Sequence, residues 1–271
     1  MHLSEAEREQ RARFGQSYRR NLLPVMLRIE KAVCGCNYGG TSWATRGEID
    51  DVAEKRARRP GQRLLDLGAG SGWPGLYLAA SSGCDITLVD LPAEGLVIAA
   101  ARAKADRLAG VLSVAAADGR ALPYGDKRFD AITHSDVLCC LPGKQAVLAE
   151  CRRTVADKGR MIFSVISVAP DLSEIDRARA IETGPPYVAS AIGYGEMFER
   201  TGWETVETVD LMAQFLKSAT TFLEVDRENR ADLAELLGEE DYEQRLQKDR
   251  DLIDAITRGI LRRDLHCLRA G

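Results

Sequence analysis

One stretch decides the fold of this chain: Leu64-Leu-Asp-Leu-Gly-Ala-Gly-Ser-Gly-Trp-Pro-Gly75. Its first four residues predict a short buried strand, and the glycine-rich residues 68–75 lead into a helix that continues to about Ser82. Glycine has no side chain and accepts a positive φ, so a turn of this composition lets the backbone come close to a ligand. The turn between strand and helix is therefore the first candidate binding site.

Strand and helix patterns alternate along the residues that follow this turn. Further strands are predicted at 85–90, 111–114, 129–133 and 160–168, and helices at 94–109 and about 142–156. Such alternation produces βαβ crossovers and a doubly wound, mainly parallel α/β sheet. Two later strand candidates, 203–210 and 263–269, bring the predicted sheet to seven strands.

Composition excludes several classes of protein. The 271 residues are 45% hydrophobic and 29% charged, which is ordinary for a packed domain and excludes a disordered chain. No run approaches the ~20 apolar residues of a membrane span, and the polar segment 4–20 is no signal peptide. A protein with a net charge of −4 would gain little binding free energy from the counterions released by a nucleic acid, so nucleic-acid binding is disfavoured.

Cysteine and histidine usage predicts neither a disulfide framework nor a metal site. The seven cysteines are odd in number, and Cys34-Gly-Cys36 has no second ligand pair at zinc-like spacing. The three histidines (His2, His134 and His266) do not supply this second ligand pair. We expect free or buried thiols in a cytoplasmic protein. The densest basic run, Lys55, Arg56, Arg58 and Arg59, is expected to be a solvated helix face.

Three acids lie at the ends of successive predicted strands or just after them. Asp66 precedes Gly68 by two residues, where its charge would repel a pyrophosphate but suit a cofactor with a cationic amine and a sulfonium. Asp90 ends the second strand, where a carboxylate can bond both ribose hydroxyls. Asp118 follows the third strand, where it can accept a hydrogen bond from an adenine amino group.

This order of residues resembles the class I S-adenosylmethionine-dependent methyltransferases of the methyltransferase-11 type, over about residues 64–168. The resemblance includes Asp-x-Gly-x-Gly-x-Gly, the acid after strand two, Asp118, and Leu122-Pro-Tyr followed by Phe129-Asp130. It implies a Rossmann-like fold and S-adenosyl-L-methionine as cofactor, with S-adenosyl-L-homocysteine as product. The implied contacts are Gly68, Ala69 and Gly70 at the methionine part, Asp90 and Leu91 at the ribose and adenine, and Asp118 and Gly119 at the adenine edge.

The same resemblance divides the chain into three parts of a single domain. Residues 1–60 form N-terminal helices and a loop that covers the cofactor, residues 61–168 the cofactor-binding core, and residues 169–271 the rest of the sheet. Residues at about 211–261 carry an apolar helical stripe, which predicts a helical cap inserted beside the sheet. A dimer interface would produce the same stripe, so a monomer and a homodimer both remain open.

The end of the fourth strand reads His134-Ser-Asp-Val-Leu-Cys-Cys-Leu-Pro142. In enzymes of the methyltransferase-11 type, which include phosphoethanolamine and quinone-precursor enzymes, this segment faces the transferred methyl group. Alignment with the Ser-Arg-Asp-x-x-x-His-Leu pattern of the phosphoethanolamine enzymes makes Asp136 the candidate catalytic residue, with Ser135 beside the cofactor and Cys140 in the acceptor pocket. The pattern's His is absent, which weighs against a choline pathway. Asp136 could equally cap the next helix, and His134 is expected to be a strand-end residue.

A small-residue loop precedes the sheet, and a second candidate segment follows the fifth strand. The resemblance implies that Asn37-Tyr-Gly-Gly-Thr-Ser-Trp43 closes over the methionine end. Tyr38 and Thr41 are then candidate cofactor contacts and Trp43 a pocket wall, although Trp43 could equally be a core residue. Tyr194 lies where these enzymes insert acceptor-binding elements, and is a third pocket candidate.

The leading hypothesis is a soluble enzyme that moves a methyl group from S-adenosylmethionine to N, O or C of a small-molecule acceptor. Most of the rate can come from in-line placement in a dry pocket, and a base is needed only for a protonated acceptor. Three alternatives stay open: an RNA or DNA methyltransferase, a nicotinamide dehydrogenase, and a cofactor-binding module without activity. The segment His134-Ser-Asp-Val argues against the first and Asp66 against the second.

Overall fold

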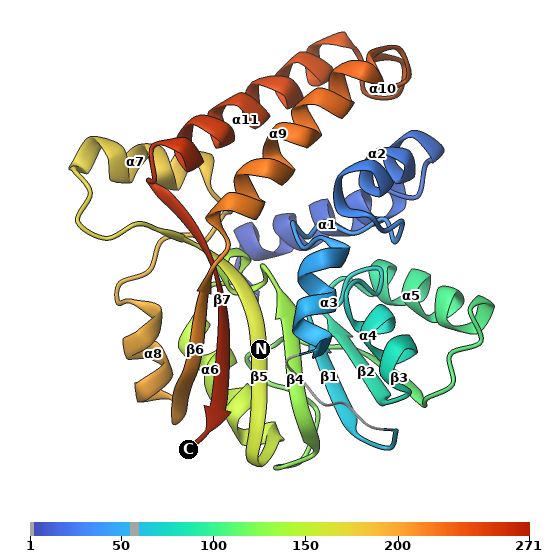
Figure 1. The fold of residues 1–271 in the computed structure, drawn as a ribbon, viewed down its shortest axis with the longest axis vertical. Helices are drawn as coiled ribbons and strands as arrows, with labels where there is room; N and C mark the ends of the chain where they lie inside the picture. The colour runs from blue at the N-terminus through green and yellow to red at the C-terminus, as the bar shows by residue number, and fades with distance from the viewer. Residues whose placement is uncertain (1–2, 55–59) are drawn as a thin grey trace.

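A seven-stranded sheet runs through the part of the chain that the computed structural model describes, residues 3–54 and 60–271 (Figure 1). The strand order is β3-β2-β1-β4-β5-β7-β6; β1 to β5 pair in parallel, and β7 runs antiparallel to both β5 and β6. The strands are β1 Arg63–Leu67, β2 Asp85–Asp90, β3 Leu112–Ala116, β4 Phe129–Ser135, β5 Val155–Val168, β6 Trp203–Asp210 and β7 Leu261–Ala270.

The predicted doubly wound, mainly parallel α/β fold is confirmed by this sheet. Several strands differ in their bounds from the prediction. β4 ends at Ser135 instead of residue 133, and β7 covers Leu261–Ala270 instead of 263–269. β5 begins at Val155, earlier than predicted, because Val155 already pairs with Phe129 across a register shift. β3 ends at Ala116 instead of residue 114 because its pairing with β2 continues to Asp90.

Helices pack on both faces of the sheet and along one end of it. Figure 1 shows α3 in front of the sheet and α6 behind it, with α1, α2 and the helices α9 to α11 along the upper end. The described helices are α1 Glu5–Arg20, α2 Pro24–Cys34, α3 Arg46–Glu54, α4 Gly75–Ser82, α5 Ala93–Ala105, the 3-10 turn η1 Leu138–Cys140, α6 Lys144–Thr154, α7 Glu174–Thr183, α8 Tyr194–Arg200, α9 Met212–Glu228, α10 Arg230–Leu237 and α11 Glu239–Thr257.

Several helices differ from what the sequence predicts. Those predicted at 94–109 and about 142–156 are shorter, Ala93–Ala105 and Lys144–Thr154. Helix α3 is described as far as Glu54, and the basic run Lys55, Arg56, Arg58 and Arg59, predicted to be a solvated helix face, lies outside the described residues. Helix α7 was not predicted, although its start carries a recognisable signal: the side chain of Ser173 accepts the Asp176 N–H at 3.1 Å, as an N-cap residue does.

The core lies between the sheet and its flanking helices. Leu65, Ile132 and Phe163 come from three neighbouring strands and are fully buried in the largest apolar cluster. The helices α9 to α11 have an apolar interior of their own, which α2 completes. An ion pair between Asp226 and Arg245 joins α9 to α11. Within the described residues, the helices are too short or too polar to cross a membrane.

Replacing Leu65 with Ala is expected to lower the free energy of unfolding by about 2–5 kcal/mol, because a side chain with no exposed surface leaves a cavity among close-packed neighbours. Urea unfolding of the variant and the parent measures the difference. Val97→Ala on α5 is the control, since Val97 is 70% exposed and its loss should cost less than about 0.5 kcal/mol. Equal losses in the two variants would contradict this view of the core.

Candidate functional site

The carboxyl ends of β1 to β4 open into a cavity of about 1260 Å³, its mouth included. Turns after these strands form one side of it, and α1 with the loop 40–43 forms the other. Parallel strands bring their carboxyl ends to the same edge, which is where open α/β sheets bind their ligands. The cavity therefore lies where the fold places a binding site.

Most of the site residues predicted from the sequence line this cavity. Their roles toward a cofactor or an acceptor stay predictions. The predicted residues that line it are Thr41, Trp43, Gly68, Ala69, Gly70, Asp90, Leu91, Asp118, Gly119, Ser135, Asp136 and Cys140.

Two glycines of the turn after β1 have no room for a side chain. Gly68 has φ +65°, and a Cβ there would lie 2.5 Å from a methyl carbon of Val137. Gly70 has φ +51°, and a Cβ there would meet the ring of Tyr18 at 2.9 Å. Both the backbone conformation and the close approach therefore require glycine, and the turn presents bare backbone to the cavity.

Asp66, predicted to contact the cofactor, lies below this turn instead of lining the cavity. Its side chain is 1% exposed, and Oδ2 accepts the Gly75 N–H at 2.9 Å where α4 begins. A buried carboxylate needs such donors to offset its lost hydration. Asp66 thus connects the end of β1 to the start of α4 and fixes the path of the glycine turn between them.

Asp90 is the acid that the turn holds at the cavity wall. Its Oδ2 accepts the Gly70 N–H at 2.7 Å and the Tyr18 hydroxyl at 3.1 Å, and its Oδ1 accepts the Leu91 N–H at 2.7 Å. Burial raises the pKa of Asp90 to about 6, and these three hydrogen bonds limit the rise. The carboxylate is therefore fixed in place beside the glycine turn.

Asp118 is held by a cation that was not predicted as a site residue. Arg120 donates to both oxygens of Asp118, at 2.7–3.2 Å, and forms an ion pair with Glu7 of α1 at 2.6 Å. Burial opposes the charge of Asp118, but Arg120 outweighs it and lowers the pKa of that carboxyl. Asp118 and Arg120 are two residues apart, whereas Glu7 is remote in sequence and is brought there by the fold.

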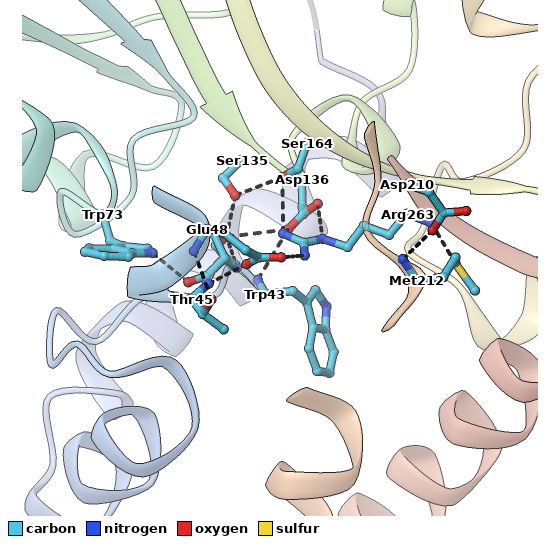
Figure 2. Close-up of polar contacts among 12 residues, drawn as sticks. Trp43, Thr45, Glu48, Trp73, Ser135, Asp136, Ser164, Asp210, Met212 and Arg263 are labelled. Carbon is cyan, nitrogen blue, oxygen red and sulfur yellow. Dashed lines mark hydrogen bonds and ion pairs between the residues drawn. The ribbon is translucent and has the colours of Figure 1, made fainter. Parts of the chain in front are cut away.

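Asp136 lies at the other end of the cavity and faces a buried arginine (Figure 2). Arg263 of β7 donates Nε to Oδ1 at 3.0 Å and Nη2 to Oδ2 at 3.1 Å. The Trp43 N–H also donates to Oδ2, at 3.3 Å. Asp136 has φ +55°, a conformation that Asp and Asn tolerate better than most residues. Its carboxylate therefore connects the last strand to the loop over the cavity.

Arg263 makes contacts on its other side as well, and none of them was predicted. Its Nη1 donates to Glu48 Oε1 at 2.7 Å, and its Nη2 to Ser164 Oγ at 3.3 Å. Burial disfavours its charge, but Asp136 and Glu48 raise the pKa of Arg263 above its usual value. The guanidinium is 1% exposed and stays charged between two carboxylates.

The loop over the cavity is fixed by several further hydrogen bonds. Ser42 Oγ lies 2.6 Å from Ser135 Oγ, which lies 3.1 Å from Ser164 Oγ. Trp73 Nε1 donates to the Ala44 carbonyl at 3.0 Å. Glu48 accepts the Thr45 N–H at 2.6 Å while Thr45 Oγ1 accepts the Glu48 N–H, which is a capping box at the start of α3. The loop thus enters α3 in a defined conformation.

Besides Asp66, two further predicted residues do not line the cavity. Tyr38 packs against Trp73, with ring centroids 5.3 Å apart, and lies under the guanidinium of Arg102 at 4.4 Å. Tyr194 begins α8 and packs near Phe198 and His266, with ring centroids about 6 Å away. Trp73 and His266, the ring neighbours of Tyr38 and Tyr194 that come from other elements, are distant in sequence.

The helices α9 to α11 contribute no lining residue to this cavity among the residues described. They meet it through Trp43, whose ring packs edge-on against Phe215 and Phe222 of α9, with centroids 5.3 and 5.4 Å apart. The predicted cap therefore supports the wall that Trp43 forms. Residues 3–54 and 60–271 also contain no group of three His, Cys, Asp or Glu placed to hold a metal ion, and His2 lies outside them.

His134 lies beside the cavity but is enclosed in the core. It is 2% exposed, stacks on Phe163 with centroids 4.2 Å apart, and has no partner for either ring nitrogen among the described residues. Burial lowers the pKa of His134 to about 3. The imidazole is therefore neutral at pH 7.

Comparison with known proteins identifies the central part of the chain. Residues 65–163 match the family model described as a methyltransferase domain. Methyltransferase GfsG of Streptomyces halstedii is 26% identical over 189 residues, which are 64% of this chain and 67% of that protein. Phosphoethanolamine N-methyltransferase 1 of Zea mays is 24% identical over 80% of this chain, but the match spans 42% of that protein. The match thus spans two thirds of the first relative and less than half of the second.

Solved structures show the same fold. A putative sarcosine dimethylglycine methyltransferase from Galdieria sulphuraria has a TM-score of 0.74 at 17% identity, covering 82% of both chains. Phosphoethanolamine N-methyltransferase 2 of Haemonchus contortus, solved with phosphomonomethylethanolamine and S-adenosylhomocysteine, has a TM-score of 0.76 at 16% identity, over 94% of this chain and 59% of that one. At these identities the likeness concerns the fold.

Replacing His134 with Phe is expected to make the protein less sensitive to acid. The unfolded chain binds a proton at His134 below pH 6.5 and the folded protein only near pH 3, so the parent loses stability as the pH falls below 6.5. The variant lacks this loss. The difference in free energy of unfolding, variant minus parent, should therefore be about 2 kcal/mol larger at pH 5 than at pH 7.5. Urea unfolding at the two pH values measures it, and an unchanged difference would show that His134 is protonated in the folded state.

Proposed function

Because residues 65–163 form a methyltransferase domain, we propose that the protein transfers a methyl group from S-adenosyl-L-methionine to N, O or C of a small-molecule acceptor. The observation that carries the proposal is the carboxylate of Asp90, fixed at the cavity wall by the backbone of the glycine turn. The proposal is supported by similar proteins that are named for small-molecule methylation. They include a glycine/sarcosine/dimethylglycine N-methyltransferase and a 27-O-demethylrifamycin SV methyltransferase.

The cavity fits such a cofactor in three ways. The turn at Gly68 and Gly70 presents bare backbone to the cavity, because a Cβ at either position would clash with Val137 or Tyr18. Ser71 lines the cavity with a buried Oγ that has no partner among the described residues, so it is available to a ligand. Asp90 offers carboxylate oxygens at the end of β2, where this fold type binds ribose. We assign the glycine turn to the methionine part, Asp90 and Leu91 to the ribose, and Asp118 and Gly119 to the adenine.

The cofactor, when bound, supplies a methyl group that is already activated by its sulfonium. The task left to the protein is to hold the acceptor in line and to exclude water. Trp43 and the loop 40–43 close the cavity, and the hydroxyls of Ser42 and Ser135 can orient a polar acceptor atom. Asp136 is engaged by Arg263 and by the Trp43 N–H, so we assign it to positioning and charge instead of proton removal.

The walls near Asp136 are mostly apolar, which favours a small organic acceptor. They include Val137, Cys139, Leu141 and Ile166. A polyanion is a poor fit for a chain with a net charge of −4, so a nucleic-acid substrate is not proposed. We place the enzyme in the cytoplasm, in keeping with seven cysteines that form no disulfide, as a monomer or homodimer.

Asp90→Ala is expected to weaken binding of S-adenosylhomocysteine at least tenfold, because it removes the carboxylate assigned to the ribose hydroxyls. Isothermal titration calorimetry measures the affinity of the parent and the variant. Asp106→Ala is the control, since Asp106 is an exposed residue at the end of α5 and should bind like the parent.

Methyl transfer itself is tested by following S-adenosylhomocysteine formation with a panel of amines, phenols, alcohols and carboxylates. Turnover of one of these classes is the expected result. Failure of the parent to bind S-adenosylhomocysteine would refute the proposal. Binding without turnover of any acceptor would favour a cofactor-binding module without activity.

A further inference from the structure

The buried charges at the Asp136 end of the cavity do not balance. Arg263 contributes one positive charge, and Asp136 and Glu48, which both contact it, contribute two negative ones. Their side chains are 1%, 6% and 10% exposed, so water screens them poorly. We refer to these three residues as the acid–arginine triad. Its formal charge is −1.

The neighbourhood of the triad does not correct this imbalance. Glu48 and Arg263 line a second cavity of about 830 Å³, where Arg263 is the one Lys or Arg among the described lining residues and Asp51 adds a further carboxylate. In the main cavity, four described lining carboxylates (Glu7, Asp90, Asp118 and Asp136) face two arginines, Arg11 and Arg120. Arg120 is itself engaged by two of those carboxylates.

The triad reaches the main cavity through Asp136. Asp136 lines the main cavity, while Arg263 and Glu48 lie behind it (Figure 2). An Asp136–Arg263 pair alone would be neutral, so Glu48 is the residue that makes the sum negative. A cation within several Å of Asp136 would be stabilised by this sum, and a neutral group of the same shape would not.

We propose that the acid–arginine triad is a specificity device that favours an onium cation at its end of the cavity, and that this cation is the sulfonium of the methyl donor. The inference rests on the proposed function. In methyl transfer the acceptor's lone pair forms the new bond to carbon, the carbon–sulfur pair stays on sulfur, and any acceptor proton leaves to solvent. The donor's sulfur is thus cationic and the product's sulfur is neutral, so the triad attracts the donor more than the product.

The test compares three ligands by calorimetry: S-adenosylmethionine, S-adenosylhomocysteine, and sinefungin, an analogue with a protonated amine in place of the sulfonium. Asp136→Asn removes the charge and keeps the shape, and Asn accepts the positive φ at this position. This variant should lower the affinity for both cationic ligands on the order of tenfold relative to S-adenosylhomocysteine.

Glu48→Gln is the second variant, and it separates charge from local structure. Gln can maintain the capping box with Thr45, and Glu48 is not a lining residue of the main cavity among those described. The same selective loss is expected, smaller in size, because the removed charge lies behind Arg263. Asp106→Asn is the control, because an exposed carboxylate that lines neither cavity should leave all three affinities unchanged.

The outcomes separate the two proposals. A selective loss for both cationic ligands in Asp136→Asn and Glu48→Gln supports the triad as a charge-selective site. Equal changes for all three ligands would overturn it, because the triad would then act on the shape of the site and not on the charge of the ligand. No change in any affinity would overturn it as well, because the charge of the triad would then not affect binding. If the parent protein binds none of the three, the proposed function fails, whatever the role of the triad.

Discussion

The burial of one guanidinium is the constraint on which the rest of this site depends. A charged group removed from water is tolerated only where other charges and hydrogen bonds replace its hydration. Arg263 meets this requirement with Asp136, 127 positions away, and Glu48, 215 positions away. These partners come from the end of β4 and the start of α3. One side chain therefore fixes the last strand, the middle of the sheet and the loop over the cavity relative to one another.

The opposite end of the cavity relies on backbone geometry instead of buried charge. The glycine turn keeps its conformation because Asp66 accepts the Gly75 N–H on one side and Asp90 accepts the Gly70 N–H on the other. The two carboxylates therefore have different tasks, although both end strands: one orders the start of α4, and the other remains at the cavity wall. The site is thus assembled from a rigid backbone turn and a network of side-chain charges, joined by the sheet between them.

Local signals in the sequence were enough to predict the fold and the glycine-turn end of the site. The turn, the acids after β2 and β3, and the strand–helix alternation depend on residues near one another, so their patterns are visible in one sequence. The Thr45–Glu48 capping box is also a local signal, but it was not predicted. The partner of Asp136 could not be predicted. No local pattern around an arginine within Leu261–Ala270 indicates which distant carboxylate it contacts. Tyr38 and Tyr194 lie outside the cavity, and the contacts of their rings with Trp73 and His266 are likewise set by tertiary packing.

The strand order β5-β7-β6 has a consequence for how this sheet can be made on the ribosome. β7 leaves the ribosome after β6, yet it lies between β6 and β5 and pairs with both. Until residues 261–270 have emerged, β5 has an unpaired edge and β6 has no neighbour in the sheet. An open strand edge is a template for pairing with other chains. A chain in which β7 has not yet paired therefore has exposed strand edges, and the pairing of Leu261–Ala270 with β5 and β6 closes them.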